Sequence, residues 1–438
     1  MQTFDLLESE VRGYCRSWPV VFASAEGSTL VDEHGRHYVD FFAGAGALNY
    51  GHNHPALIEA LLGHLARNGV VHGLDMATTT KRDFLLKFDE VVLKPRGLDY
   101  KLQFPGPTGT NAVEAALKLA RKVTGRDRVI GFTNAFHGMT LGALAVTGNS
   151  MKRRGAGVPL TFADSLPFAG FFGADVDTVG YFEAFLADGT GLDTPAAVIV
   201  ETVQAEGGLN VAGFDWLRRL AALCREHAIL LIVDDIQVGC GRTGPFFSWE
   251  GSGVVPDIVC LSKSLSGLGL PFALTLMRPD LDVWEPGEHN GTFRGNNAAF
   301  VTAMAALDEF WTDDALHREV ERKGARIRTG LQSLASRHDG VFEEVRGRGL
   351  INGVRTTMPE AAGEIAAAAF DEGVLVETAG PADEVVKLLP PLTVDDAAID
   401  HVVEVLGLAT ERVIDKLGED LLSGTAPADE DAGEEVAK

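Results

Sequence analysis

The stretch ILLIVDDIQ, residues 229–237, decides the fold of this chain, because it combines a buried type of strand with a carboxylate at its end. About thirty residues later, the stretch IVCLSKS, residues 258–264, repeats the pattern and ends beside an amine. Apolar runs rich in β-branched residues predict buried strands of a parallel sheet. The carboxyl ends of such strands are where an open α/β sheet binds ligands. We therefore expect Asp234 and Lys263 to lie at one edge of the sheet.

An aspartate and a lysine placed together suit pyridoxal phosphate (PLP). This cofactor needs a carboxylate that keeps its pyridine nitrogen protonated, so that the ring can accept electrons, and a lysine that forms a Schiff base. The sequence therefore predicts that Asp234 and Lys263 hold PLP. Lys263 is also expected to move the substrate proton as a general acid and base.

Composition limits the classes of protein to which the chain can belong. With 438 residues, 46% of them hydrophobic, the chain can bury a large core and is expected to form two or three domains. The net charge of −24 disfavours nucleic-acid binding, which needs a basic surface. The four cysteines are scattered and the histidines lack ligand spacing, so we expect neither a disulfide framework nor a metal site.

The expected location is the cytoplasm. Scattered cysteines fit a reducing compartment. The first residues are acidic and lack the basic region of a secretory signal. No apolar run approaches the roughly 18 residues that a membrane span requires, so we expect no membrane association.

The pattern of strands and helices changes along the chain. Residues 57–297 alternate apolar strands with helical patterns, which predicts a large PLP-binding α/β domain with a mostly parallel central sheet. Residues 298–422 begin with one long alanine- and leucine-rich helix and continue as α+β. Residues 1–56, with a predicted hairpin, are expected to join them, so that a smaller α+β domain is built from both termini. Residues 423–438 are acidic with little apolar content, which predicts a disordered tail.

A phosphate site is predicted where a glycine-containing turn opens a helix. Gly109, Thr110 and Asn111 lie at this point, where free amides and the positive helix end favour an anion. The alternative is a purely structural helix cap, formed by Asn111 with Glu114.

Two apolar side chains are expected to face the cofactor ring. Phe136 follows a predicted strand and can stack on the ring, with His137 beside it as a further contact. If the chain stays extended after Asp234, Ile236 lies on the same side and presses the opposite ring face.

The segment GCGRTG, residues 239–244, formally matches a dinucleotide-binding fingerprint. In that motif a strand runs directly into the glycines and a helix follows. Here residues 234–237 intervene, and the following PFFSW does not resemble a helix start. A nicotinamide-dependent oxidoreductase is therefore a poor alternative.

Four successive segments resemble the signatures of class III (ω-amino acid) aminotransferases, in the family order. They are ETVQAEGG at 201–208, DDIQVGCGRTG at 234–244, SKS at 262–264 and GTFRGN at 291–296. The resemblance implies a fold-type I PLP-dependent transferase that forms a homodimer or a dimer of dimers with shared active sites.

The same resemblance implies roles for further residues. Gln237 would contact the cofactor near its phenolic oxygen, and Thr292 would reach the phosphate of the neighbouring subunit. Many relatives use an arginine, paired with the glutamate that matches Glu206, to grip a substrate carboxylate. This chain has Lys387 at that position, and lysine cannot form the two-pronged contact of a guanidinium. An exposed strand-end lysine is the alternative.

Segments at 7–22, 40–55 and 72–76 are similar to the branch of the family that works in ectoine biosynthesis. That branch moves the terminal amino group of L-2,4-diaminobutyrate to 2-oxoglutarate, or back from glutamate to aspartate semialdehyde. The alternatives are another ω-amino acid transaminase, acting on 4-aminobutyrate or ornithine, and a fold-related PLP lyase, mutase or decarboxylase. A catalytically idle scaffold is a third.

Overall fold

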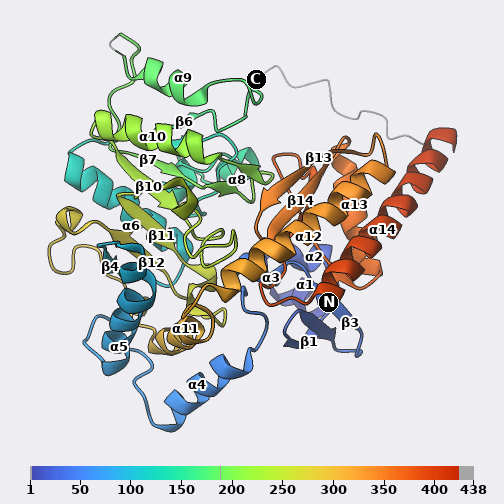
Figure 1. Ribbon diagram of the computed structural model, residues 1–438, viewed down its shortest axis with the longest axis horizontal. Coiled ribbons are helices and arrows are strands. Elements are labelled where there is room, and N and C mark those ends of the chain that lie inside the picture. Colours follow the sequence, from blue (N-terminus) through green and yellow to red (C-terminus); the bar gives the residue numbers. More distant parts are fainter. Residues whose placement is uncertain (1, 188, 424–438) are drawn as a thin grey trace.

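A computed structural model describes residues 2–187 and 189–423 (Figure 1). Its larger part is built on a seven-stranded sheet of order β4-β12-β11-β10-β7-β5-β6. The strands in that order are β4 (Lys101–Gln103), β12 (Leu274–Met277), β11 (Ile258–Leu261), β10 (Leu230–Asp234), β7 (Ala197–Val200), β5 (Val129–Phe132) and β6 (Ala163–Leu166). β12 runs antiparallel to both of its neighbours, and the other pairs are parallel. The expected α/β fold with a mostly parallel sheet is therefore confirmed.

The register of the central strands brings the two charged strand ends together. Asp234 is paired with Cys260 across β10 and β11, and Lys263 follows three residues later. Both strands are buried along their whole length. This burial explains the unbroken apolar runs in the sequence.

Helices cover this sheet and extend beyond its edge. They are α4 (Pro55–Ala66), α5 (Thr79–Phe88), α6 (Gly109–Thr124), α7 (Leu141–Ala145), α8 (Ser150–Arg154), α9 (Thr178–Phe185), α10 (Phe214–Glu226) and α11 (Asn297–Phe310). α6 packs its alanine- and leucine-rich face on β11 and β12. α11 packs against α4 and α5 (Figure 1).

The smaller part contains two four-stranded sheets, of orders β13-β14-β17-β16 and β1-β2-β3-β15. The first contains β13 (Phe342–Arg348), β14 (Ile351–Thr356), β17 (Val385–Leu388) and β16 (Glu377–Ala379). The second contains β1 (Phe22–Glu26), β2 (Thr29–Asp32), β3 (His37–Asp40) and β15 (Val374–Leu375). β15 pairs with β3, so segments from the two ends of the chain share a sheet. The division into domains stays a prediction.

The remaining elements complete the description. α12 (Ala315–Arg337), α13 (Pro359–Asp371) and α14 (Asp396–Ser423) accompany the smaller part (Figure 1). The other short elements are α1 (Gln2–Leu7), α2 (Tyr14–Ser17), α3 (Ala43–Gly46), β8 (Val203–Gln204) and β9 (Asn210–Val211). None of the described helices is long and apolar enough to cross a membrane. Apart from Ser423, the predicted acidic tail lies outside the described residues.

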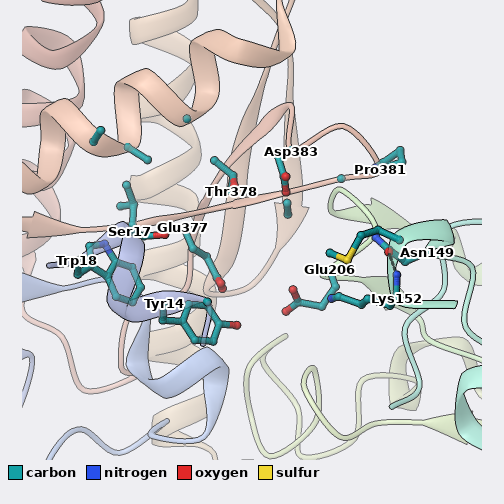
Figure 2. Close-up of a pocket in the computed structure, with 18 residues that line it drawn as sticks. Tyr14, Ser17, Trp18, Asn149, Lys152, Glu206, Glu377, Thr378, Pro381 and Asp383 are labelled. Atoms are coloured by element: carbon teal, nitrogen blue, oxygen red, sulfur yellow. Dashed lines mark hydrogen bonds between the residues drawn. The ribbon is translucent and has the colours of Figure 1, made fainter. Parts of the chain in front are cut away.

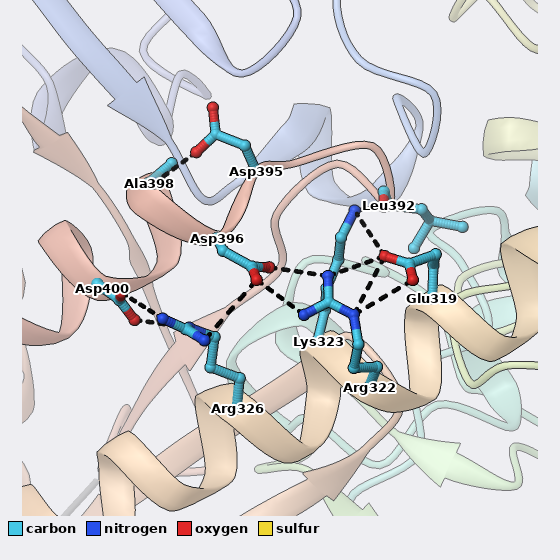
Figure 3. A network of polar contacts seen from close by, with 9 residues as sticks. All are labelled: Glu319, Arg322, Lys323, Arg326, Leu392, Asp395, Asp396, Ala398 and Asp400. Atoms are coloured by element: carbon cyan, nitrogen blue, oxygen red, sulfur yellow. Dashed lines mark hydrogen bonds and ion pairs between the residues drawn. The ribbon is translucent and has the colours of Figure 1, made fainter.

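An exposed network of charges joins α12 to the start of α14 (Figure 3). Arg322 contacts Asp396 at 2.8 Å, and Arg326 donates to Asp400 at 2.7 Å. Glu319 contacts Arg322 at 2.8 Å from the preceding turn of α12. The sequence gives no direct sign of the contacts between the two helices, because these partners lie 74 residues apart.

Three local expectations from the sequence were wrong. The long helix expected from residue 298 is two helices, α11 and α12. The first helix ends at Phe310. The next residue, Trp311, is buried, and its indole donates to the Tyr50 hydroxyl at 2.8 Å. Asp313 then accepts the amide of Ala315 at 2.8 Å and helps begin α12.

The cap of α6 is the second correction. Thr108, not Asn111, is the N-cap, because the helix begins at Gly109. Asn111 accepts the Thr108 amide at 3.2 Å from the third helical position. Glu114 instead accepts the amides of Gly142 and Ala143 at the start of α7.

The third correction concerns Ile236, which lies in a turn rather than in an extended segment. Its amide donates to the Asp234 carboxylate at 3.1 Å, which bends the chain directly after β10. The alternation argument for its side-chain direction therefore fails. The side chain nevertheless lines the pocket beside Asp234.

Candidate active site

A pocket of about 170 Å³ lies at the carboxyl ends of the central strands. It is lined by most of the residues that the sequence predicted for the cofactor. They are Gly109, Thr110, Phe136, His137, Asp234, Ile236, Gln237 and Lys263, joined by Gly138, Glu201 and Val238. The fold thus gathers five separate segments of the sequence at the carboxyl ends of the strands.

Lys263 lies in the first turn after β11, at the start of a short 3₁₀ helix (Lys263–Ser266). Its backbone has φ of 49°, which is the left-handed region that a lysine rarely adopts. Ser264 holds this turn in place, because its hydroxyl donates to the Gly46 carbonyl at 2.7 Å. Burial, together with Lys387, lowers the pKa of Lys263 to about 8. Its neutral, nucleophilic form is therefore accessible near neutral pH.

Asp234 is buried and is held by His137. The Nδ1 atom of His137 lies 2.7 Å from the Asp234 carboxylate. Because an ionised carboxylate only accepts hydrogen bonds, Nδ1 must carry the hydrogen. The His137 side chain is fully buried, and its Nε2 has no partner among the described residues. The histidine therefore orients the carboxylate, and Asp234 keeps a fixed direction in the pocket.

Glu201 is a buried carboxyl group that sequence reasoning did not select. It follows β7 and accepts the Phe136 amide at 2.9 Å, so it fixes the backbone that carries the predicted stacking ring. Burial, reinforced by the nearby Asp234, raises the pKa of Glu201 well above its usual value. Its place at the end of a buried strand follows the same rule that selected Asp234 and could have revealed it.

The start of α6 offers a cradle for a phosphate. The first amides of a helix have no partner within the helix and carry its positive end. Glycine at positions 109 and 138 keeps the entrance open: a Cβ on Gly109 would lie 3.1 Å from Ile236, and one on Gly138 would lie 2.5 Å from the Thr110 hydroxyl. Thr110 also pairs with Thr140 at 2.6 Å. The donors and the space fit the phosphate group of PLP.

Glu206 and Glu377 line a second and larger cavity, of about 600 Å³ (Figure 2). Behind these two carboxylates Lys387 is fully buried. Its Nζ atom lies 2.9 Å from Glu206 and 2.8 Å from Glu377. Lys387 and Glu377 are direct partners across β17 and β16. The alternative of an exposed strand-end lysine is therefore wrong, because Lys387 lies within a buried strand.

The three ionisable groups of this cluster have pKa values that are shifted in different ways. Burial alone would raise the pKa of Glu206, yet Lys387 and Lys263 lower it to about 2. Burial raises the pKa of Glu377 to about 7. Burial alone would lower the pKa of Lys387, but the two glutamates raise it. Lys387 and Glu206 are therefore charged at neutral pH, whereas the pKa of Glu377, about 7, lies close to neutral pH.

Gln237 connects the two cavities. Its side-chain amide donates to Glu206 and to the Ala45 carbonyl, both at 2.9 Å. Two predicted residues lie away from the pocket. The Oδ1 atom of Asn111 accepts the Thr108 hydroxyl at 2.8 Å. The carbonyl of Thr292 contacts the His72 ring at 2.9 Å. A role for Thr292 in a neighbouring subunit stays a prediction.

The profile of the family described as aminotransferase class-III matches residues 14–409. The chain is a class III aminotransferase. A relative from Nocardia farcinica, named diaminobutyrate–2-oxoglutarate transaminase, is 57% identical over 97% of each chain. A relative of the same name from Virgibacillus pantothenticus is 54% identical over 95% of this chain and all of its own.

Solved structures agree with this aminotransferase in fold. The ornithine aminotransferase of Toxoplasma gondii, described with partial occupancy of PLP at its active site, has a TM-score of 0.81 and 28% identity. The match covers 95% of this chain and 94% of that one. A transaminase from the marine bacterium Virgibacillus has a TM-score of 0.85 at 20% identity, over 95% and 99% of the two chains. The expected fold-type I architecture is confirmed.

Sequence reasoning missed two further residues of this aminotransferase. Glu377 and Tyr14 both line the larger cavity, from β16 and α2. Glu377 lies in a short strand with no catalytic motif, and Tyr14 lies far away near the amino terminus. The pairing of Glu377 with Lys387 across two strands depends on sheet register, which the sequence pattern did not reveal.

Proposed function

We propose that the protein transfers the γ-amino group of L-2,4-diaminobutyrate to 2-oxoglutarate, giving L-aspartate 4-semialdehyde and L-glutamate, as a step of ectoine biosynthesis. The observation that carries the proposal is the meeting of Lys263 and Asp234 in one pocket of a class III aminotransferase. Relatives with 54–57% identity over nearly the whole chain, which are named for this reaction, support the choice of substrates.

PLP is the cofactor that the pocket fits. When bound, it supplies an electron sink for the carbanion that forms as the substrate loses a proton. Asp234, oriented by His137, would keep its ring nitrogen protonated. Phe136 and Ile236 would enclose the ring, and the start of α6 would bind the phosphate.

Lys263 has two roles in this proposal. Its neutral amine would hold the cofactor covalently, and the same amine, once free, would move a proton at the reacting substrate carbon. The lowered pKa of Lys263 suits both roles, because an amine with a pKa near 8 can accept and release a proton near neutral pH. Gln237 holds the side chain of Glu206 at the rim of the pocket.

The second substrate, 2-oxoglutarate, carries two carboxylates. We propose that Lys387 binds one of them when Glu206 releases it. Glu206 can swing toward Gln237, with which it already shares a hydrogen bond. Thr292 is proposed to complete the phosphate site of a second subunit in a homodimer or a dimer of dimers. The proposed location is the cytoplasm, because the scattered cysteines fit a reducing compartment.

Mixing the cofactor-loaded enzyme with diaminobutyrate and 2-oxoglutarate, and measuring glutamate, tests the proposed function. 4-Aminobutyrate and ornithine serve as competing donors. We expect diaminobutyrate to have the highest kcat/KM and Lys263→Ala to abolish transfer. Preference for ornithine or 4-aminobutyrate would contradict the substrate assignment, and release of ammonia or carbon dioxide without glutamate would contradict amino transfer.

A further inference from the structure

The larger cavity communicates with the cofactor pocket. Between them lies a cleft of about 110 Å³, whose lining includes Phe136, Glu206 and Lys152. Phe136 also lines the cofactor pocket, and Glu206 and Lys152 also line the larger cavity. The cleft therefore lies between the cofactor pocket that contains Lys263 and the larger cavity.

One wall of this cavity is acidic. Glu377 is buried and lines the cavity, and its Oε1 atom is ion-paired with the Nζ atom of Lys387 at 2.8 Å. Glu377 and Glu206 together carry one more negative charge than Lys387 compensates when both are ionised. Tyr14 extends toward the same space from α2 (Figure 2). This wall therefore carries an excess of negative charge when both glutamates are ionised.

The opposite wall carries a cation. Lys152 reaches toward Glu206 from the short helix α8 (Figure 2). Its ammonium lies 4.4 Å from the centre of the Phe136 ring, and it makes no ion pair within the part of the chain that the structure describes. Asn149 caps this helix by accepting the Lys152 amide at 2.9 Å, which fixes the lysine backbone. The cation is thus held over the ring of Phe136 without a carboxylate partner among the described residues.

We propose that this cavity recognises the amino-acid end of the donor, with Glu377 accepting its α-ammonium and Lys152 binding its α-carboxylate. The proposal rests on the proposed function, because it requires a donor that reacts at one amine while a second amine and a carboxylate stay distant. It assigns the donor to residues other than Lys387, which both glutamates already neutralise. It also explains a preference for a diamino acid over a simple ω-amino acid.

Three amine substrates allow the two proposed contacts to be tested independently. Diaminobutyrate has both the distal ammonium and the carboxylate, 4-aminobutyrate has only the carboxylate, and 1,3-diaminopropane has only the ammonium. The first half-reaction of the cofactor-loaded enzyme is followed by cofactor absorbance for each amine. The variants are Glu377→Gln and Lys152→Met.

Glu377→Gln is expected to lower kcat/KM for diaminobutyrate and diaminopropane about tenfold or more, the loss expected for one charge-assisted hydrogen bond, with a much smaller change for 4-aminobutyrate. Lys152→Met is expected to lower it for diaminobutyrate and 4-aminobutyrate and much less for diaminopropane. Matched controls remove the same charges outside the cavity: Glu343→Gln in β13 of the same sheet, and Arg154→Met on the same helix as Lys152.

Equal losses for all three amines in Glu377→Gln would overturn the proposal, because they would mean that Glu377 acts only by holding Lys387. An equal loss with diaminopropane in Lys152→Met would likewise show that the lysine supports the Phe136 ring rather than a carboxylate. A parent enzyme that reacts with 4-aminobutyrate as well as with diaminobutyrate, and does not discriminate between them in any variant, would refute the proposed substrate as well. Failure of the variants alone refutes only the recognition residues.

Discussion

The charges around Lys387 and the charges between α12 and α14 use the same chemistry in opposite surroundings. Lys387 is fully buried between Glu206 and Glu377. Arg322 and Arg326 instead meet Asp396 and Asp400 in solvent, where water and salt screen each pair (Figure 3). An unpaired charge has a high free-energy cost when it is buried and a low one when it is exposed to water. The buried cluster therefore serves the site, and the exposed network contributes little to stability.

The cost of burial also limits what the buried cluster can do. Replacing a buried ion pair by apolar residues is often neutral for stability, but removing one partner is not. Three charged side chains in the interior can bind a charged ligand, which apolar side chains at the same positions could not do. Four changes test this contrast, beginning with the one of largest expected effect.

Replacing Lys387 with methionine keeps most of its volume and leaves two buried carboxylates without a cation. We expect a loss of about 3–5 kcal/mol in the free energy of unfolding, as for other broken buried pairs. Denaturant unfolding measures it, with Lys94→Met, which breaks an exposed pair with Asp89, as the control. Adding Glu377→Gln should restore part of the loss. Parent-like stability of Lys387→Met would mean that the cluster is not charged as described.

Replacing Asp234 with asparagine should leave cofactor binding and remove most turnover. A neutral amide cannot keep the ring nitrogen protonated, and a charge-assisted hydrogen bond is worth about 1.5–3 kcal/mol, so kcat should fall at least about tenfold. Asp235→Asn is the matched control, since its carboxylate accepts the Ser248 amide rather than facing the pocket. Steady-state kinetics of both variants decides the matter, and parent-like turnover of Asp234→Asn would require another partner for the ring nitrogen.

The pH dependence of cofactor attachment tests the environment of Lys263. Burial favours the neutral amine and lowers the pKa of Lys263 to about 8. Only the neutral amine attacks the cofactor aldehyde, so the attachment rate of the apoenzyme should rise about tenfold per pH unit below this pKa and level off above it. Stopped-flow absorbance after mixing with PLP measures the rate. A continued steep rise well above pH 8 would show an ordinary, solvated lysine.

The smallest effect is expected from the exposed network. Arg322→Met removes contacts with Glu319 and Asp396, both of which are well exposed to solvent. We expect the melting temperature to change by at most about 1 °C, and the change to vanish at high salt. Thermal unfolding at two salt concentrations measures it. A fall as large as that of Lys387→Met would remove the distinction between the two regions.

Much of the site could be predicted from the sequence. Asp234, Lys263, Phe136 and the start of α6 follow from rules about strand ends and helix starts, and the family resemblance added Gln237. Other features escaped because local patterns do not contain them. The turn at Ile236 depends on a single hydrogen bond to Asp234, and the break between α11 and α12 depends on Trp311 reaching Tyr50.

The sequence by itself determined the α/β class, the strands that deliver Asp234 and Lys263, and membership of the class III aminotransferases. Apolar periodicity and motif spacing are local, so they can be read along the chain. Only the tertiary structure decided that Lys387 is buried and that Glu377 lies beside it. That pairing depends on the register of β16 against β17, which is set by packing against the rest of the domain and not by the residues of either strand alone.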